Sequence, residues 1–211
     1  MLKKYAVLLC VIAAIILIVI ATTYYPGGEQ FNKSSIGFSW TKNYLSNLFN
    51  QQAVNGANNP GRPWVIAGVF FLALSIALFF YRFSKKVPVK SASNIIKYVG
   101  VSAMLVAVFA VTSYHDIVIT IAGTGALLSM FYITVFIFKS KLVGFKIFSV
   151  VCLLVFYCTN YLYYTSTRLD LLAIVQKVCL LTIISWMLCL DHFTTAKDFE
   201  SSKKKALSTA K

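Results

Sequence analysis

Two neighbouring residues, His115 and Asp116, form the pair in this chain with the clearest capacity for chemistry. A carboxylate beside an imidazole can orient the ring and favour its protonated form, which prepares it for proton transfer. Ser46, in a distant loop, is the serine that we consider as a nucleophile for this pair. The alternative is that Asp116 caps the helix that follows, accepting hydrogen bonds from N–H groups of its first turn. The sequence leaves both interpretations open.

Lys177 is the one basic residue that lies far from both ends of an apolar run, and ionisable groups at membrane depth are functional candidates by default. It lies about 10 Å from the start of its run at 1.5 Å per residue. Its side chain either extends toward water and Asp170 or pairs with Asp116 inside the bundle. Asn160 and Gln176 lie in comparable positions, where amide side chains form interhelical hydrogen bonds. Lys177 and Asn160 are also candidate ligand contacts.

Several kinds of site are excluded or disfavoured. The chain has two histidines, His115 and His192, which we predict on opposite membrane faces, so a three-histidine zinc site is excluded. The five cysteines all fall in apolar runs without C-x-x-C spacing, which favours small apolar fillers over disulfides or thiolate metal sites. The small-residue run 122–126 favours close helix packing and lacks the loop context of a phosphate cradle. We predict no metal and no cofactor.

The elements that position these residues follow from composition. Of 211 residues, 59% are apolar and 12% charged, against about 45–50% and about 25% in soluble domains. Six runs have the roughly 17–25 apolar residues that a membrane helix needs. We predict an all-α, polytopic bundle of six transmembrane helices over residues 1–190 and a polar basic tail over 191–211. The spans are expected at about 5–23, 64–81, 95–112, 117–138, 143–163 and 171–190. The first run is too long for a typical signal-peptide core, so we expect it to be retained.

The basic residues predict the orientation. Fifteen of the twenty Lys and Arg residues lie on the side of the two termini, and four lie on the other side. The positive-inside rule then places both termini in the cytoplasm. Basic residues beside helix ends suit anionic lipid head groups, so we expect membrane lipid and not nucleic acid as the partner. The Lys203–Lys205 triplet either binds anionic lipid or is a solvated tail. Protein partners within the membrane are left open.

The outer loop, residues 24–63, contains a helix-like pattern. Ile36, Trp40, Tyr44 and Leu48 recur every four residues, which predicts an amphipathic helix of about three turns. Asn43 falls on its polar face. The helix either lies on the membrane and caps the bundle, or acts as a lid over a cavity. Trp40 and Asn43 are therefore candidate ligand contacts.

The stretch Asn43-Tyr44-Leu45-Ser46-Asn47-Leu48 resembles a motif of bacterial membrane proteins classed as domain of unknown function 998. Damage-regulated autophagy modulator (DRAM-like) proteins are distant relatives of that family. The stretch 112–116 and the six-span plan are similar too, although Asn47 stands where the family tends to have an acid. The resemblance implies a multi-pass protein of a bacterial cytoplasmic (inner) membrane and no particular activity.

Three functions are compatible with these features. The first is a non-enzymatic membrane protein that binds or organises lipid. The second is a small carrier, which would need a polar path across the membrane. The third is a lipid-modifying enzyme at the outer leaflet that uses His115, Asp116 and Ser46.

Overall fold

The computed structural model describes residues 2–200, with side chains from Lys4 onward, and the basic triplet at Lys203–Lys205 lies outside this range. Within it the fold is all-helical, with six helices long and apolar enough to cross a membrane. This confirms the predicted fold class. Five are continuous helices: α1 (Leu2–Thr23), α2 (Arg62–Ser84), α5 (His115–Phe138), α6 (Val143–Thr165) and α7 (Leu169–Phe193).

The remaining span, Lys90–Val111, is irregular, and we call it the third span. It consists of α3 (Lys90–Asn94), a π-helical turn (Ile95–Val99), α4 (Gly100–Ala107) and a 3-10 turn (Val108–Val111). Small residues bring it close to its neighbours. A Cβ on Gly100 would lie 2.6 Å from the Phe80 ring, and one on Gly125 would lie 2.8 Å from Ala103. At Gly125, the small-residue run of α5 therefore packs closely against the third span, as predicted.

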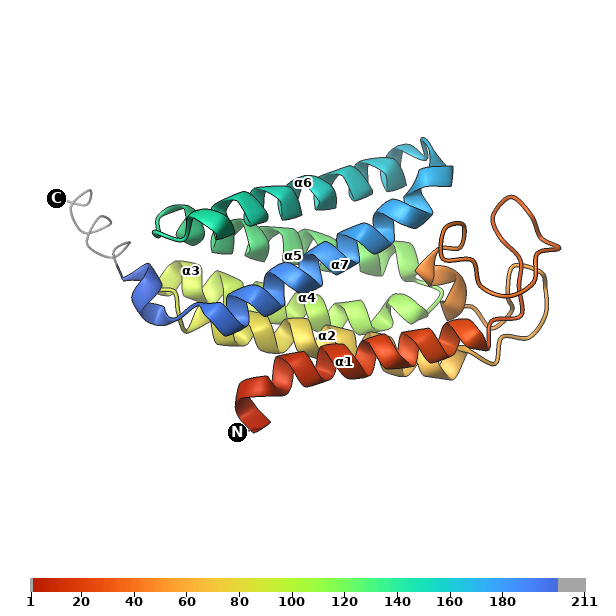
Figure 1. Ribbon diagram of the computed structural model, residues 1–211, viewed down its shortest axis with the longest axis horizontal. Coiled ribbons are helices and arrows are strands. Elements are labelled where there is room, and N and C mark those ends of the chain that lie inside the picture. Colours follow the sequence, from red (N-terminus) through yellow and green to blue (C-terminus); the bar gives the residue numbers. More distant parts are fainter. Residues whose placement is uncertain (1, 201–211) are drawn as a thin grey trace.

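The helices run alongside one another in a single bundle (Figure 1). α1 packs against α2, α2 and α5 both pack against the third span, and α6 contacts both α5 and α7. The start of α1 and the residues after α7 lie at the same end of the bundle, which we call the tail end. The loop between α1 and α2 lies at the opposite end, which we call the loop end.

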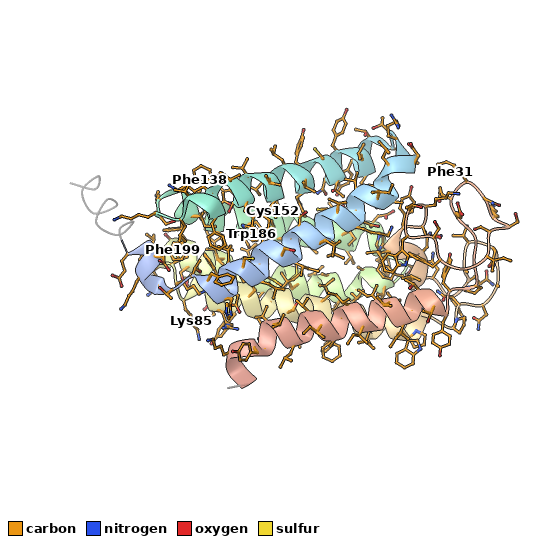
Figure 2. The ribbon with its side chains drawn as sticks, viewed as in Figure 1. Phe31, Lys85, Phe138, Cys152, Trp186 and Phe199 are labelled. Carbon is orange, nitrogen blue, oxygen red and sulfur yellow. The ribbon has the colours of Figure 1, made fainter. Side chains whose placement is uncertain are left out.

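Aromatic side chains fill the tail end. Phe79 lies 5.6 Å from Phe83 and 5.9 Å from Trp186 between ring centroids. A short 3-10 helix after α7, Ala196–Phe199, places Phe199 5.3 Å from Phe83 and fully buried. The indole N–H of Trp186 donates to Ser149 Oγ at 2.9 Å. Figure 2 shows Trp186 in the interior and Phe199 at the tail end. This end of the bundle is therefore a solid apolar core.

Charged groups at the tail end hold the end of α7. Lys86 Nζ donates to the carbonyls of Leu190 and Asp191 at 3.1 and 3.2 Å, where the helix dipole favours a cation. Arg82 pairs with the carboxylate of Asp191 at 2.9 Å. Arg82 in the last turn of α2 and Lys86 just after that helix thus have structural partners on α7.

The loop between α1 and α2 differs from the prediction. The expected three-turn amphipathic helix is wrong in extent, because only Leu45–Phe49 is helical, as a 3-10 turn. Ile36 is 96% exposed and forms an isolated bridge with Gly27. Asn43 lies on no polar surface, being fully buried.

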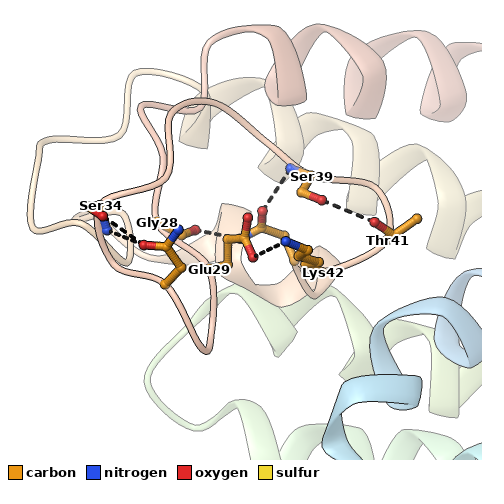
Figure 3. Close-up of polar contacts among 8 residues, drawn as sticks. Gly28, Glu29, Ser34, Ser39, Thr41 and Lys42 are labelled. Atoms are coloured by element: carbon orange, nitrogen blue, oxygen red, sulfur yellow. Dashed lines mark hydrogen bonds and ion pairs between the residues drawn. The ribbon is translucent and has the colours of Figure 1, made fainter.

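Buried amides explain this loop structure. Asn43 Nδ2 donates to the Gly28 carbonyl at 2.7 Å, and its Oδ1 accepts from the Ser39 N–H at 2.8 Å. Figure 3 shows these contacts beside the ion pair of Lys42 and Glu29. Asn59 plays the same part further along, donating to two backbone carbonyls and accepting from the Gly61 N–H. The loop is thus a folded unit organised by asparagines.

Candidate functional site: a cavity at the loop end

A cavity of about 840 Å³ lies between the helices. All the spans except α1 contribute to its wall, and the lid segment, which we define as residues 43–49, contributes Tyr44, Leu45, Ser46 and Phe49. Its lining follows α7 from Leu169 to Met187, which is about 27 Å at 1.5 Å per residue. The cavity therefore extends from the loop end through most of the bundle's depth.

The cavity opens at the loop end. The exposed residues of its lining all lie there, and the other lining residues are half-buried or buried. They come from the loop, from the start of α5 and from the end of α6: Gln30, Asp116, Thr120, Tyr164 and Ser166.

The deep part of the cavity is apolar and closed. Its lining there is aliphatic or aromatic and includes Ile76, Ala126, Met130 and Ile183. Phe79 and Trp186 lie at the bottom and belong to the aromatic core of the tail end. The cavity is consequently a blind pocket with a polar mouth and an apolar depth.

Hydrogen bonds join α5 and α6 at the mouth. The Tyr163 hydroxyl donates to Asp116 Oδ1 at 2.5 Å. One turn further along α5, Thr120 Oγ1 and the Tyr164 hydroxyl lie 2.8 Å apart. Asp116 lies in the first turn of α5 but does not cap it, because Tyr114 is the N-cap residue and makes no side-chain capping bond. Asp116 instead links two helices.

His115 also lines the cavity, and its Nδ1 lies 2.7 Å from the Ala110 carbonyl. A carbonyl oxygen only accepts, so Nδ1 carries a hydrogen and Nε2 of the neutral ring has a free lone pair. The ring is thus oriented by a backbone carbonyl of the third span. Ser46 lines the same cavity, and among the described residues no hydrogen bond joins it, His115 and Asp116 to one another.

Three contacts fasten the lid segment to α7. Lys177 Nζ donates to the Asn43 carbonyl at 2.7 Å, Gln176 Oε1 accepts from the Leu45 N–H at 3.1 Å, and the Tyr44 hydroxyl donates to the Leu169 carbonyl at 3.0 Å. Burial, followed by the nearby carboxylate of Asp170, raises the pKa of Tyr44.

The predicted Lys177–Asp116 pair is therefore wrong. Lys177 does extend toward the loop end, as helical side-chain direction predicts, but its partners are the Asn43 and Ala173 carbonyls. Asp170, the alternative partner, pairs with Arg168 at 3.2 Å.

Of the other predicted ligand contacts, one lines the cavity and two do not. Asn160 lines the cavity and donates to the Phe156 carbonyl of its own helix. Asn43 is a structural residue of the loop, and Trp40 packs edge-on against Phe38 outside the cavity lining. Sequence reasoning missed Thr120, Tyr163 and Tyr164, since tyrosines near helix ends are typical of any membrane interface.

Residues 2–200 contain no cluster of three or more His, Cys, Asp or Glu side chains that could hold a metal ion. A second depression, on the loop surface between Asn50 and Asn58, has no titratable side chain in its lining.

Comparison with known proteins returned no match for this chain among protein-family models, curated proteins or solved structures. The site must therefore be interpreted from its own geometry.

Proposed function

We propose that this chain is a multi-pass membrane protein that binds a single-chain amphiphile in the cavity at the loop end. The observation that carries the proposal is the division of the cavity into a polar mouth and a closed apolar depth. A ligand with one apolar chain and one polar head matches this division.

The lining of the cavity supports an apolar occupant. Water is a poor occupant of the depth, because each buried water needs two to four polar partners and the side chains there are aliphatic or aromatic. An apolar chain needs no such partners.

The closed bottom favours binding over conduction. A carrier or channel needs a route to the far side, and here the buried rings of Phe79, Phe83, Trp186 and Phe199 fill the tail end. Chemistry by His115 and Ser46 would need a hydrogen bond between them, and among the described residues none is formed. Reversible binding requires neither a route across the membrane nor hydrogen bonds between catalytic side chains.

We further propose that the loop end faces outward, that both termini are cytoplasmic, and that the membrane is the cytoplasmic membrane of a bacterium. The distribution of basic residues supports the orientation. The resemblance to the domain-of-unknown-function 998 family supports the location. In a cysteine-free variant, Ser34→Cys should react with a membrane-impermeant maleimide on intact cells, and Lys197→Cys should react only after lysis. The reverse pattern would refute the orientation.

Quenching of tryptophan fluorescence tests the binding. Trp186 lies at the bottom of the cavity and is 1% exposed, whereas Trp40 lies in the loop between α1 and α2 and Trp64 lies near the start of α2. In a Trp40→Phe, Trp64→Phe protein in nanodiscs, a trace amphiphile brominated at its chain terminus should quench Trp186 saturably.

Two glycine variants separate the cavity from the surrounding bilayer. Gly123 lines the cavity, and a Cβ there would have 3.9 Å to its nearest neighbour, Phe156, so Gly123→Leu should project into the ligand's space. Gly144→Leu is the matched control, because Gly144 is exposed on α6 with nothing within 4 Å. Gly123→Leu should abolish saturable quenching while Gly144→Leu preserves it. Equal quenching in both variants would mean that the probe acts from the bilayer, and the proposal would fail.

A further inference from the structure

The hydrogen bonds at the mouth also select the head group of this amphiphile. Resting on the proposed function, we infer that the head group donates hydrogen bonds and is not anionic, so that a primary ammonium is preferred, a hydroxyl accepted and a sulfate or phosphate rejected.

Three hydroxyl hydrogens at the mouth, those of Thr120, Tyr163 and Tyr164, are committed to protein partners. Thr120 Oγ1 donates to the Asp116 backbone carbonyl at 2.8 Å. Because a hydroxyl has one hydrogen, the Tyr164 hydroxyl must be the donor in its 2.8 Å contact with Thr120. Tyr163 likewise donates to Asp116 Oδ1. All three hydroxyl oxygens therefore face a ligand as acceptors.

Two more groups in the lining are also hydrogen-bond acceptors. The hydrogen on His115 Nδ1 points to the Ala110 carbonyl, which leaves Nε2 of the neutral ring as an acceptor. Thr159 Oγ1 donates to the Val155 carbonyl and retains its lone pairs. A donating head group would satisfy these acceptors, whereas a sulfate or phosphate brings only more acceptors.

The charges at the mouth agree with this polarity. Among the described residues that line the cavity, Asp116 is the one with a full formal charge at neutral pH. The basic residues of the loop end have other partners: Arg168 pairs with Asp170, Lys42 with Glu29, and Arg62 Nε donates to the Phe49 carbonyl. Lys177 faces the Asn43 carbonyl. The exposed Lys33 is absent from the lining.

The helix dipoles of α5 and α7 would favour an anion, since both helices begin at the mouth. Asp116 and Asp170 already occupy the two first turns and compensate these partial charges. An anionic head group would therefore meet a carboxylate at each helix N-terminus.

The test extends the Trp186 assay to four probes with one brominated chain and different heads: primary amine, alcohol, trimethylammonium and sulfate. The amine should bind tightest, and the alcohol should bind more tightly than the sulfate. The trimethylammonium head separates donation from charge, because it is cationic without an N–H, and it should bind more weakly than the amine. A sulfate or a trimethylammonium that binds as tightly as the amine would overturn the inference.

Asp116→Asn should reduce the preference for amine over sulfate about tenfold, which is about 1.4 kcal/mol. Asp170→Asn is the matched control, since Asp170 is also an exposed aspartate at the loop end but lies outside the lining. It should leave the preference unchanged, and an unchanged preference in Asp116→Asn would also overturn the inference. If no probe quenches Trp186 in the unsubstituted cavity, the proposed function fails, which is a different result from equal binding of all four heads.

Discussion

Lys177→Met tests how much one charged side chain contributes to holding the lid segment against α7. Lys177 Nζ makes two 2.7 Å hydrogen bonds, but the one to the Ala173 carbonyl stays within α7. Of these two bonds, only the one to the Asn43 carbonyl joins α7 to the lid segment. Methionine keeps an unbranched apolar side chain of similar reach and removes the charge and the donors.

The expected loss is about 1–2 kcal/mol for opening of the lid segment. Hydrogen bonds to charged groups contribute about 1.5–3 kcal/mol in proteins, and bonds between membrane helices average only about 0.6 kcal/mol. The half-buried position of Lys177 at the loop end falls between these two cases. A loss of 1–2 kcal/mol raises the open fraction about 5–30-fold.

Hydrogen exchange measures this directly. The Leu45 amide donates to Gln176 Oε1 in the closed lid segment, so its exchange rate should rise about 5–30-fold in Lys177→Met. Lys42→Met is the control, because Lys42 is 62% exposed and its 3.4 Å pair with Glu29 is a surface ion pair worth less than about 1 kcal/mol. Unchanged exchange at Leu45 in Lys177→Met, or an equal change in Lys42→Met, would refute the reasoning.

Two further predictions concern stability and are measured as thermal unfolding in detergent. Phe199→Ala should destabilise the protein by about 3–5 kcal/mol, because it empties a fully buried site in the aromatic core, whereas Phe193→Ala at a 68% exposed position should cost far less. Equal shifts would mean that Phe199 does not support the bundle. Asn59→Ala should cost about 1–3 kcal/mol for each of the two backbone carbonyls that it leaves without a partner, and Asn58→Ala, at an exposed position, is its control. Unfolding of Asn59→Ala at the wild-type temperature would contradict the structural part given to that amide.

The six spans could be predicted from hydropathy, and their ends could not. The helices continue past the apolar runs, as at Arg62 before the second predicted span and at Phe193 after the sixth. Hydropathy marks the part of a helix that suits lipid. Backbone hydrogen bonding then continues the helix until a local signal ends it, as the positive φ of Ser166 does after α6.

The loop shows why periodicity fails over short distances. The four-residue recurrence from Ile36 to Leu48 has the spacing of a helix, but Asn43 has a buried partner fifteen residues earlier at Gly28. Such a contact between distant residues leaves no periodic trace in the sequence. It fixes Asn43 inside the loop and restricts the helix to a 3-10 turn.

The candidate site could be predicted in part. The rule that ionisable residues in a membrane are functional candidates led to His115 and Asp116, and both line the cavity. The same rule led to Lys177, which is structural. The tyrosine partners on α6 could not be found, because Asp116 and Tyr163 are 47 positions apart and nothing in the sequence between them relates the two.

The basic residues at the loop end are bound to other groups of the protein, so few charged side chains remain to contact a ligand at the mouth. A cation in a thinly charged chain would ordinarily be the first candidate for binding a lipid phosphate. Here Arg62 holds a lid-segment carbonyl, Lys177 holds another, and Arg168 pairs with Asp170. Each of these contacts shapes the mouth without entering it. Arg62 and Lys177 thus fix the lid segment, and Asp116 faces the ligand together with the hydroxyl acceptors of α5 and α6. The head group that we infer, which carries a positive charge or donates hydrogen bonds, complements these groups.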